Sequence, residues 1–366
     1  MDYELKYMRR CIQLARCGEA GAPPNPMVGA VVVHDGRIIG EGYHRRCGGP
    51  HAEVNAIASV RDKQLLPQST IYVSLEPCAH YGKTPPCADL IVSSRIPRVV
   101  IGCTDPFAKV NGLGIKKLRD AGCEVETGVL EQECRALNRP FFTFHSRHRP
   151  WITLKWAQSK DGFIDHIRET AGLTTEKEPG ITPEEETGIP GRKPGITQGK
   201  EAEGTAACVF SDALTRTLVH RLRARHQAIL VGTRTAIADN PSLTTRLWPG
   251  PDPLRLTIDR HGVLSPALRL MDGTAPTVVY TRESLGEILA DLRQRGIQSL
   301  IVEGGARLLQ SFIDAGLWDE ARIETAPFRL NRGVAAPVLT GALLQSTRDY
   351  GGQLLQLYTR EPDETP

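Results

Sequence analysis

Three residues of the kinds that bind zinc, His51, Cys78 and Cys87, are far apart in the sequence, so a shared metal requires the fold to bring them together. Three protein ligands leave the fourth tetrahedral position open to water, as in catalytic zinc sites, whereas structural sites usually have four protein ligands. Glu53 follows His51 by only two residues, which makes it a poor extra ligand but a good candidate for moving protons beside the metal.

The sequence around each ligand predicts where it lies in the fold. Helices are predicted at 51–60 and 87–94, each directly after a proline, which is tolerated in a first helical turn. A strand is predicted at 70–75, shortly before the first cysteine ligand. The ligands thus come from two helix starts, where the dipole favours thiolates, and from one strand end, where open α/β sheets bind ligands.

Strand-like and helix-like segments alternate in two series, which predicts two α/β domains, 1–145 and 146–366. The chain is long enough to give each domain a substantial core. The predicted junction is 144–150, and the most evident helix of the second series is 211–225. The predicted strands are 28–33, 70–75, 99–102 and 124–127 in the first series and 151–156, 228–231, 254–258, 277–280 and 299–302 in the second.

The overall composition argues against several classes of protein. The 366 residues carry 45 basic and 42 acidic side chains, a net charge of +3, which predicts no nucleic-acid or membrane partner. No apolar run approaches the roughly 20 residues of a membrane span, and the first residues show no signal pattern. Nine cysteines, an odd number, predict free thiols and a cytoplasmic location. The sequence leaves the oligomeric state open, and a homo-oligomer is possible.

One segment of the second series, 169–207, has an unusual composition. It holds seven Gly, four Pro, eight Glu and seven Thr, and it has no aromatic residue. Such a stretch cannot bury enough apolar surface to offset its chain entropy, so we expect a mobile surface insertion. The alternative is an ordered lid over a site in the second domain.

A closed structural zinc site is the alternative to a catalytic one. It requires a fourth protein ligand, for which His44, Cys47 and His80 are the candidates. The chain would then be a zinc-stabilised, non-catalytic scaffold, and nothing would depend on Glu53. The cysteines outside the proposed ligand set are expected to be structural or incidental.

Three motifs point to one family of zinc enzymes. H-x-E followed by P-C is typical of zinc deaminases, although the second cysteine follows here as C-x8-C rather than C-x-x-C. PNPMVG at 24–29, HAEVNA at 51–56 and EPCAHYGKTPPC at 76–87 together resemble the bifunctional riboflavin-biosynthesis deaminase/reductase family, in which the longer spacing is normal. The resemblance implies an N-terminal cytidine-deaminase-like three-layer domain followed by a dihydrofolate-reductase-like α/β domain.

For the first domain, the resemblance implies Zn²⁺-dependent hydrolytic deamination of 2,5-diamino-6-ribosylamino-4(3H)-pyrimidinone 5′-phosphate. Glu53 would protonate a ring nitrogen and then the leaving ammonia. A deaminase for free nucleosides or for nucleic acid is the rival, but it predicts C-x-x-C spacing and, for nucleic acid, a basic surface. The residues implied for substrate binding are Asn25, His44, His80 and Lys83. A loop lysine such as Lys83 is otherwise usually solvated surface.

KWAQSKDG at 155–162 resembles the opening of the family's reductase half. That half would reduce the ribosyl group to ribityl with NADPH, giving 5-amino-6-ribitylaminouracil 5′-phosphate. No G-x-G-x-x-G is present, but VEGGARLL at 302–309 joins a predicted strand to a helix, where glycines let a pyrophosphate approach backbone N–H groups. The alternative for this segment is a simple strand-to-helix turn.

The same resemblance implies contacts in the second domain. The implied cofactor contacts are Gln158, Asp161, Thr235, Asp239, Arg260, Gly304 and Gly305, with Arg260 as the candidate for the 2′-phosphate. The implied substrate contacts are Arg223, Leu243, Arg246 and Glu303, the two arginines being candidates for the phosphate. A solvated basic helix face is the alternative for Arg223. The family's Gly-x-Ser-x-x-Trp-like segment is replaced here by 169–207, so an active deaminase half alone is a further alternative.

Overall fold

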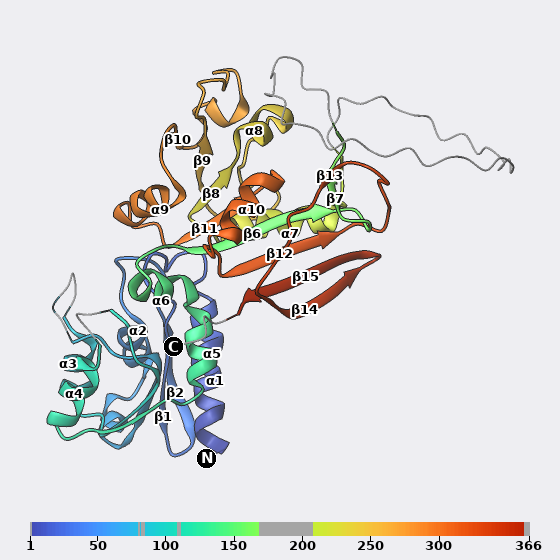
Figure 1. The fold of residues 1–366 in the computed structure, drawn as a ribbon. Helices are drawn as coiled ribbons and strands as arrows, with labels where there is room; N and C mark the ends of the chain where they lie inside the picture. The colour runs from blue at the N-terminus through green and yellow to red at the C-terminus, as the bar shows by residue number, and fades with distance from the viewer. Residues whose placement is uncertain (1, 80, 82–84, 108–110, 168–207, 362–366) are drawn as a thin grey trace, which may run out of the picture.

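The structure is a computed structural model, and it describes residues 2–79, 81, 85–107, 111–167 and 208–361 (Figure 1). The predicted insertion at 169–207 lies outside the described residues, as do His80 and Lys83. The described chain forms a five-stranded sheet in its first part and an eight-stranded sheet in its second part.

The first sheet has the strand order β2-β1-β3-β4-β5. β1 pairs antiparallel with β2 and with β3, whereas β3, β4 and β5 are parallel. A hairpin turn joins β1 to β2, and Asp35 and Gly36 both adopt the positive φ that a tight hairpin turn requires (46° and 71°). The strands are β1 (Gly29–His34), β2 (Arg37–Tyr43), β3 (Thr70–Leu75), β4 (Arg98–Cys103) and β5 (Glu124–Thr127).

Helices cover both faces of this sheet and make a three-layer domain (Figure 1). Ala52 and Ile91 belong to the core on one face, and Met8 and Phe141 belong to the core on the other. One face carries α2 (Ala52–Ser59), α3 (Cys87–Ser93) and α4 (Leu113–Asp120), and the other carries α1 (Asp2–Arg16), α5 (Glu131–Leu137) and α6 (Arg139–Ser146). A short 3₁₀ helix, η1 (Lys63–Gln68), precedes β3.

Glycine lets α2 lie close against β2. A Cβ atom on Gly42 would lie 2.3 Å from the backbone nitrogen of Ala56, so no larger residue fits at this position without moving the helix. The close packing fixes the start of α2, and with it the position of His51, against the sheet.

The second sheet has the order β10-β9-β8-β11-β6-β12-β15-β14, and all its neighbours from β10 to β12 are parallel. β14 (Ala342–Tyr350) and β15 (Gln353–Arg360) extend it in antiparallel fashion. The other strands are β6 (Trp151–Gln158), β8 (Ala228–Val231), β9 (Leu254–Ile258), β10 (Thr277–Tyr280), β11 (Ser299–Glu303) and β12 (Glu320–Thr325). β7 (Phe163–Asp165) and β13 (Val334–Ala335) form a separate pair.

Helices also lie on both faces of the second sheet. Phe312 and Leu292 belong to a large apolar cluster on one face, whereas Ala236 and Leu222 pack on the other. The first face carries α9 (Leu285–Gln294) and α10 (Ala306–Asp314), and the second carries α7 (Ala213–Ala224) and α8 (Thr233–Asp239), with the short 3₁₀ helix η2 (Arg269–Met271) nearby. Within the described residues, no helix is long and apolar enough to cross a membrane.

Asp319 anchors the segment that links the two sheets. Its carboxylate accepts hydrogen bonds from Arg149 at 2.5 and 2.8 Å, from Arg147 at 3.3 Å and from the backbone N–H of Ile152 at 2.9 Å. The Asp319 side chain is only 2% exposed. The predicted junction at 144–150 therefore contains two arginines that are tied to the start of β12, although its first residues belong to α6.

Asp319→Ala should lower the free energy of unfolding by about 3–5 kcal/mol, because it leaves the Arg149 charge buried without its partner. Arg147→Ala is the matched control: its side chain is 51% exposed, so its loss should cost no more than about 1 kcal/mol. Urea unfolding followed by circular dichroism measures both variants. Equal effects of the two substitutions would contradict an anchoring role for the buried carboxylate.

Candidate active sites

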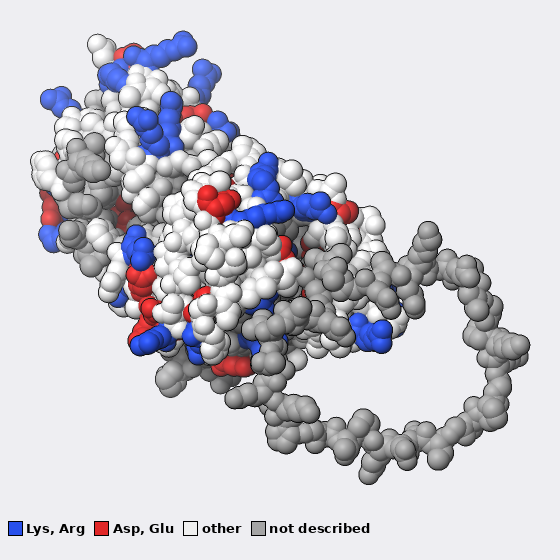
Figure 2. All heavy atoms as spheres, turned by 90° about the horizontal axis from the view of Figure 1, so that it is seen from above, with Lys and Arg blue, Asp and Glu red and all other residues white. Residues whose placement is uncertain are grey.

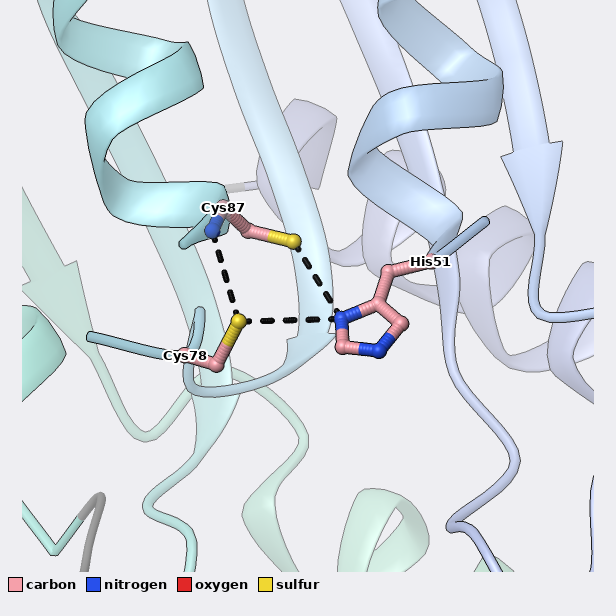
Figure 3. A group of neighbouring side chains, drawn as sticks. All are labelled: His51, Cys78 and Cys87. Carbon is pink, nitrogen blue, oxygen red and sulfur yellow. Dashed lines mark hydrogen bonds between the residues drawn. The ribbon is translucent and has the colours of Figure 1, made fainter. Parts of the chain in front are cut away.

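His51, Cys78 and Cys87 meet at one point of the first domain (Figure 3). His51 is the N-cap residue of α2, Cys87 is the first residue of α3, and Cys78 follows the end of β3. The Nδ1 atom of His51 lies 3.6 Å from Sγ of Cys78 and 3.3 Å from Sγ of Cys87. The three ligand atoms all lie within 4.8 Å of one another.

These distances match those between ligands of a tetrahedral zinc ion. When a tetrahedral zinc ion binds sulfur at about 2.3 Å and nitrogen at about 2.0 Å, the sulfur and the nitrogen lie about 3.5 Å apart. The observed sulfur–nitrogen distances of 3.6 and 3.3 Å bracket this value. Two thiols and one imidazole are also the ligand types that zinc prefers, so the residues fit the ion.

The start of α3 favours a thiolate at Cys78. The backbone N–H of Cys87 donates to the Cys78 sulfur at 3.3 Å (Figure 3). Hydrogen bonds from Cys87 and then from His51 lower the pKa of Cys78, whereas the same contact and burial raise the pKa of Cys87. The pair therefore presents one ready thiolate, which is the protonation state that a metal ligand needs.

No fourth protein ligand joins the group within the part of the chain that the structure describes. Both ring nitrogens of His44 are already engaged, with Asn25 at 3.2 Å and with the carbonyl oxygen of Pro50 at 3.0 Å. The thiol of Cys47 donates to the Asn25 side chain at 3.6 Å. His80, the third candidate for a closed site, lies outside the described residues.

Glu53 is buried on the first turn of α2, and its side chain lines the same cavity as His51 and Cys78. Burial raises the pKa of Glu53 to about 7, although the neighbouring His51 acts in the opposite direction. The carboxyl group does not belong to the cluster of ligand atoms. It is therefore a separate acid or base placed beside the metal-binding group.

A cavity of about 430 Å³ opens onto these residues, a volume in the range of small-molecule sites. Asn25 and His44, two of the implied substrate contacts, line it, whereas the other two, His80 and Lys83, lie outside the described residues. The cavity is lined further by Phe107, Phe141, Phe144, His145, Gly296 and Gln298, none of which the sequence motifs indicated.

Glu76 of the EPC motif has a supporting role that its sequence context did not predict. Its carboxylate accepts hydrogen bonds from the backbone N–H groups of Gly112, Gly114 and Ile115 at 2.9–3.2 Å. These contacts satisfy free donors at the start of α4, as a capping carboxylate does. Glu76 thus holds α4 beside the loop that carries Cys78.

The second domain gathers charged side chains near the carboxyl ends of its parallel strands. Glu303 ends β11 and binds Arg223 of α7 through two hydrogen bonds, of 3.1 and 2.7 Å. Burial alone would raise the pKa of Glu303, but Arg223 and Lys155 outweigh it and lower the pKa to about 2. Arg223 is therefore part of a buried ion pair and not of a solvated basic helix face.

Two further charges belong to this group and were not predicted as site residues. Lys155 on β6 stands in register with Glu303 on one side and with Arg322 of β12 on the other. Burial lowers the pKa values of Lys155 and of Arg322. Glu303, Lys155 and Arg322 thus form a row across β11, β6 and β12. β6 is far from β11 and β12 in the sequence, so the row exists only in the folded chain.

The glycines after β11 have a packing role of their own. Gly304 has φ +84°, and a Cβ atom there would lie 2.6 Å from Cγ2 of Thr235 on α8. Gly305 is the N-cap of α10, and a Cβ atom there would lie 3.3 Å from Oγ1 of Thr235. A strand-to-helix turn thus accounts for both glycines, and it also brings Thr235 against the start of α10.

The remaining implied contacts lie in several places. Gln158 accepts a hydrogen bond from the Trp156 side chain at 2.8 Å, and Asp161 accepts bonds from the backbone of Leu330 and Asn331 at 3.1 and 2.8 Å. Arg246 is exposed, and its backbone N–H donates to His220. Asp239 and Arg260 are exposed, and Leu243 is buried in an apolar cluster.

Comparison with known proteins gives both halves a family. Residues 1–103 match the family described as the cytidine and deoxycytidylate deaminase zinc-binding region, and residues 150–356 match the RibD C-terminal domain. The riboflavin biosynthesis proteins RibD of Bacillus amyloliquefaciens and Aquifex aeolicus are 38% and 35% identical to the chain, over 94% and 91% of it and 90% of each relative.

A solved structure supports the same assignment. The protein from Thermotoga maritima, described as a diaminohydroxyphosphoribosylaminopyrimidine deaminase/5-amino-6-(5-phosphoribosylamino)uracil reductase, is 34% identical with a TM-score of 0.80. The match covers 98% of this chain and 99% of that one. The expected fold class, a cytidine-deaminase-like domain followed by a reductase domain, is confirmed. The chain therefore belongs to the RibD family of riboflavin biosynthesis, whose members combine a zinc-dependent deaminase domain and an NADPH-dependent reductase domain on one polypeptide.

Proposed function

We propose that the first domain, 1–145, deaminates 2,5-diamino-6-ribosylamino-4(3H)-pyrimidinone 5′-phosphate and that the second, 146–366, then reduces the ribosyl group with NADPH. The observation that carries the proposal is the ligand group of His51, Cys78 and Cys87 beside the buried Glu53 in one cavity. The name of the Thermotoga maritima protein describes the same pair of activities, which supports both steps.

In the deaminase cavity, zinc held by the three ligands would supply Lewis-acid activation of a water molecule. Glu53 is placed to take a proton from that water and to deliver protons to a ring nitrogen and to the leaving amino group. The substrate thereby gains a carbonyl oxygen and loses ammonia. Asn25 and His44, joined at 3.2 Å on the cavity wall, are assigned to holding the ring.

In the reductase domain, NADPH would supply the hydride. We assign Glu303 and Lys155 to the sugar hydroxyls, because they are the paired acid and base that stand in register on neighbouring strands. Arg223 holds Glu303 in its ionised form, so we give it a positioning role rather than a direct contact with phosphate. The exposed Arg246 is then the phosphate ligand that we favour.

We infer that the cofactor lies along the carboxyl ends of the parallel strands, where open α/β sheets bind ligands. Gly304 and Gly305 stand at the start of α10, where backbone N–H groups suit a pyrophosphate, and Thr235 packs against them. Gln158, Asp161, Asp239 and Arg260 are assigned to the same cofactor, and Leu243 to the substrate.

A small-molecule substrate suits the surface better than nucleic acid does. On the face shown in Figure 2, basic and acidic side chains are interspersed, and the net charge is only +3.

All nine cysteines are free thiols, which supports a cytoplasmic location.

Glu53→Gln should keep zinc but slow ammonia release by about 10²- to 10⁴-fold, because it removes the acid/base group and leaves the ligands intact. The unaltered protein should release ammonia from the phosphorylated diaminopyrimidine without NADPH and oxidise NADPH only after deamination. Reduction of the separately supplied deaminated compound by Glu53→Gln serves as the folding control. Ammonia release by the variant at the native rate would refute the acid/base assignment.

Arg246→Ala should raise KM for the reduction about 10- to 150-fold, because a hydrogen bond to a charged group contributes about 1.5–3 kcal/mol. Ammonia release should stay unchanged. Arg282→Ala, at an exposed position beyond β10, is the matched control and should affect neither step. Equal losses in both steps for Arg246→Ala would indicate a folding defect and contradict the phosphate assignment.

A further inference from the structure

The cavity beside the zinc ligands is walled by three separate parts of the chain. His51, Glu53 and Cys78 come from the zinc-binding region, which ends at residue 103. Further along the chain, α6 adds Phe141, Phe144 and His145. The segment between α9 and β11, which belongs to the reductase domain, adds Gly296 and Gln298.

The backbone of Gln298 is fixed at this wall by two hydrogen bonds. Its backbone N–H donates to the Gln227 side chain at 2.6 Å, and its carbonyl oxygen accepts from the backbone N–H of Trp151 at 2.8 Å. The residue is only 9% exposed. Within the described part of the chain, its carboxamide makes no hydrogen bond to protein. Because Gln298 lines the cavity, a ligand there can supply a hydrogen-bond partner for this carboxamide.

The chemistry of the wall indicates which part of the ligand Gln298 meets. His145 packs against Phe141 and Phe107 with ring centroids 4.5 and 5.0 Å apart, which forms an aromatic surface suited to a flat ring. Among the described residues that line the cavity there is no lysine or arginine. A neutral carboxamide, with donors and an acceptor, matches sugar hydroxyls better than it matches a phosphate.

We propose that Gln298 is a specificity-determining contact of the deaminase cavity and binds a hydroxyl of the substrate's ribosyl group. The inference rests on the deaminase function proposed above. It makes the reductase domain a structural part of the deaminase site, so that the first domain alone has an incomplete wall.

Gln298→Met tests this role in the full-length protein, because methionine has nearly the same length but lacks the amide. It should lower kcat/KM for ammonia release from the ribosyl phosphate substrate about 5- to 150-fold, the loss that a missing hydrogen bond in a buried site produces. The corresponding pyrimidine without the sugar serves as a competitive inhibitor, and its inhibition constant should stay unchanged. Gln294→Met, at an exposed position of α9, is the matched control and should leave both quantities unchanged.

The outcomes separate the inference from the function on which it rests. Native kcat/KM for Gln298→Met, or an equal weakening of the sugar-free inhibitor, would overturn the hydroxyl contact. Loss of zinc, or of the separately measured reduction of the deaminated compound, would show a structural role instead and would also overturn it. No ammonia release by the unaltered, zinc-loaded protein would refute the proposed deaminase function itself.

Discussion

The deaminase half depends on holding one imidazole nitrogen and two sulfur atoms at the spacing of a tetrahedral zinc site. His51 and Cys87 are placed by the first residues of two helices, and Cys78 by the loop after a strand. The glycine that lets α2 approach β2 and the carboxylate of Glu76 that caps α4 keep these elements in position. The positions of the three ligand atoms therefore depend on the packing of α2, of α3 and of the loop after β3 together.

The two domains are connected by contacts as well as by the chain that links them. The buried Asp319 ties the linking arginines to the second sheet, and Gln298 of the second domain reaches the cavity of the first. We therefore expect a change at this junction to affect the cavity of the first domain as well as the stability of the protein. In the second domain, the register of β11, β6 and β12 places the charges of Glu303, Lys155 and Arg322 in one row.

The sequence predicted best those features that depend on a short segment of the chain. The strands at 70–75, 124–127, 228–231, 254–258 and 277–280 have the predicted bounds, because each is a short run of strand-forming residues between turn signals. The zinc ligands could be proposed because histidine and cysteine at helix starts carry specific chemistry. β14 was not predicted, because most of its residues are exposed and none is buried, so it has no apolar run typical of a buried strand. Lys155, Arg322 and Gln298 were not predicted as site residues, because their neighbours come from distant parts of the chain.

X-ray absorption at the zinc edge of the purified full-length protein can identify the ligands on which the deaminase half depends. We expect one zinc per chain, with two sulfur ligands at about 2.3 Å and the remaining nitrogen or oxygen ligands at about 2.0–2.2 Å, only one of them an imidazole. A third sulfur, a second imidazole, or native protein without bound zinc would contradict the three-ligand site.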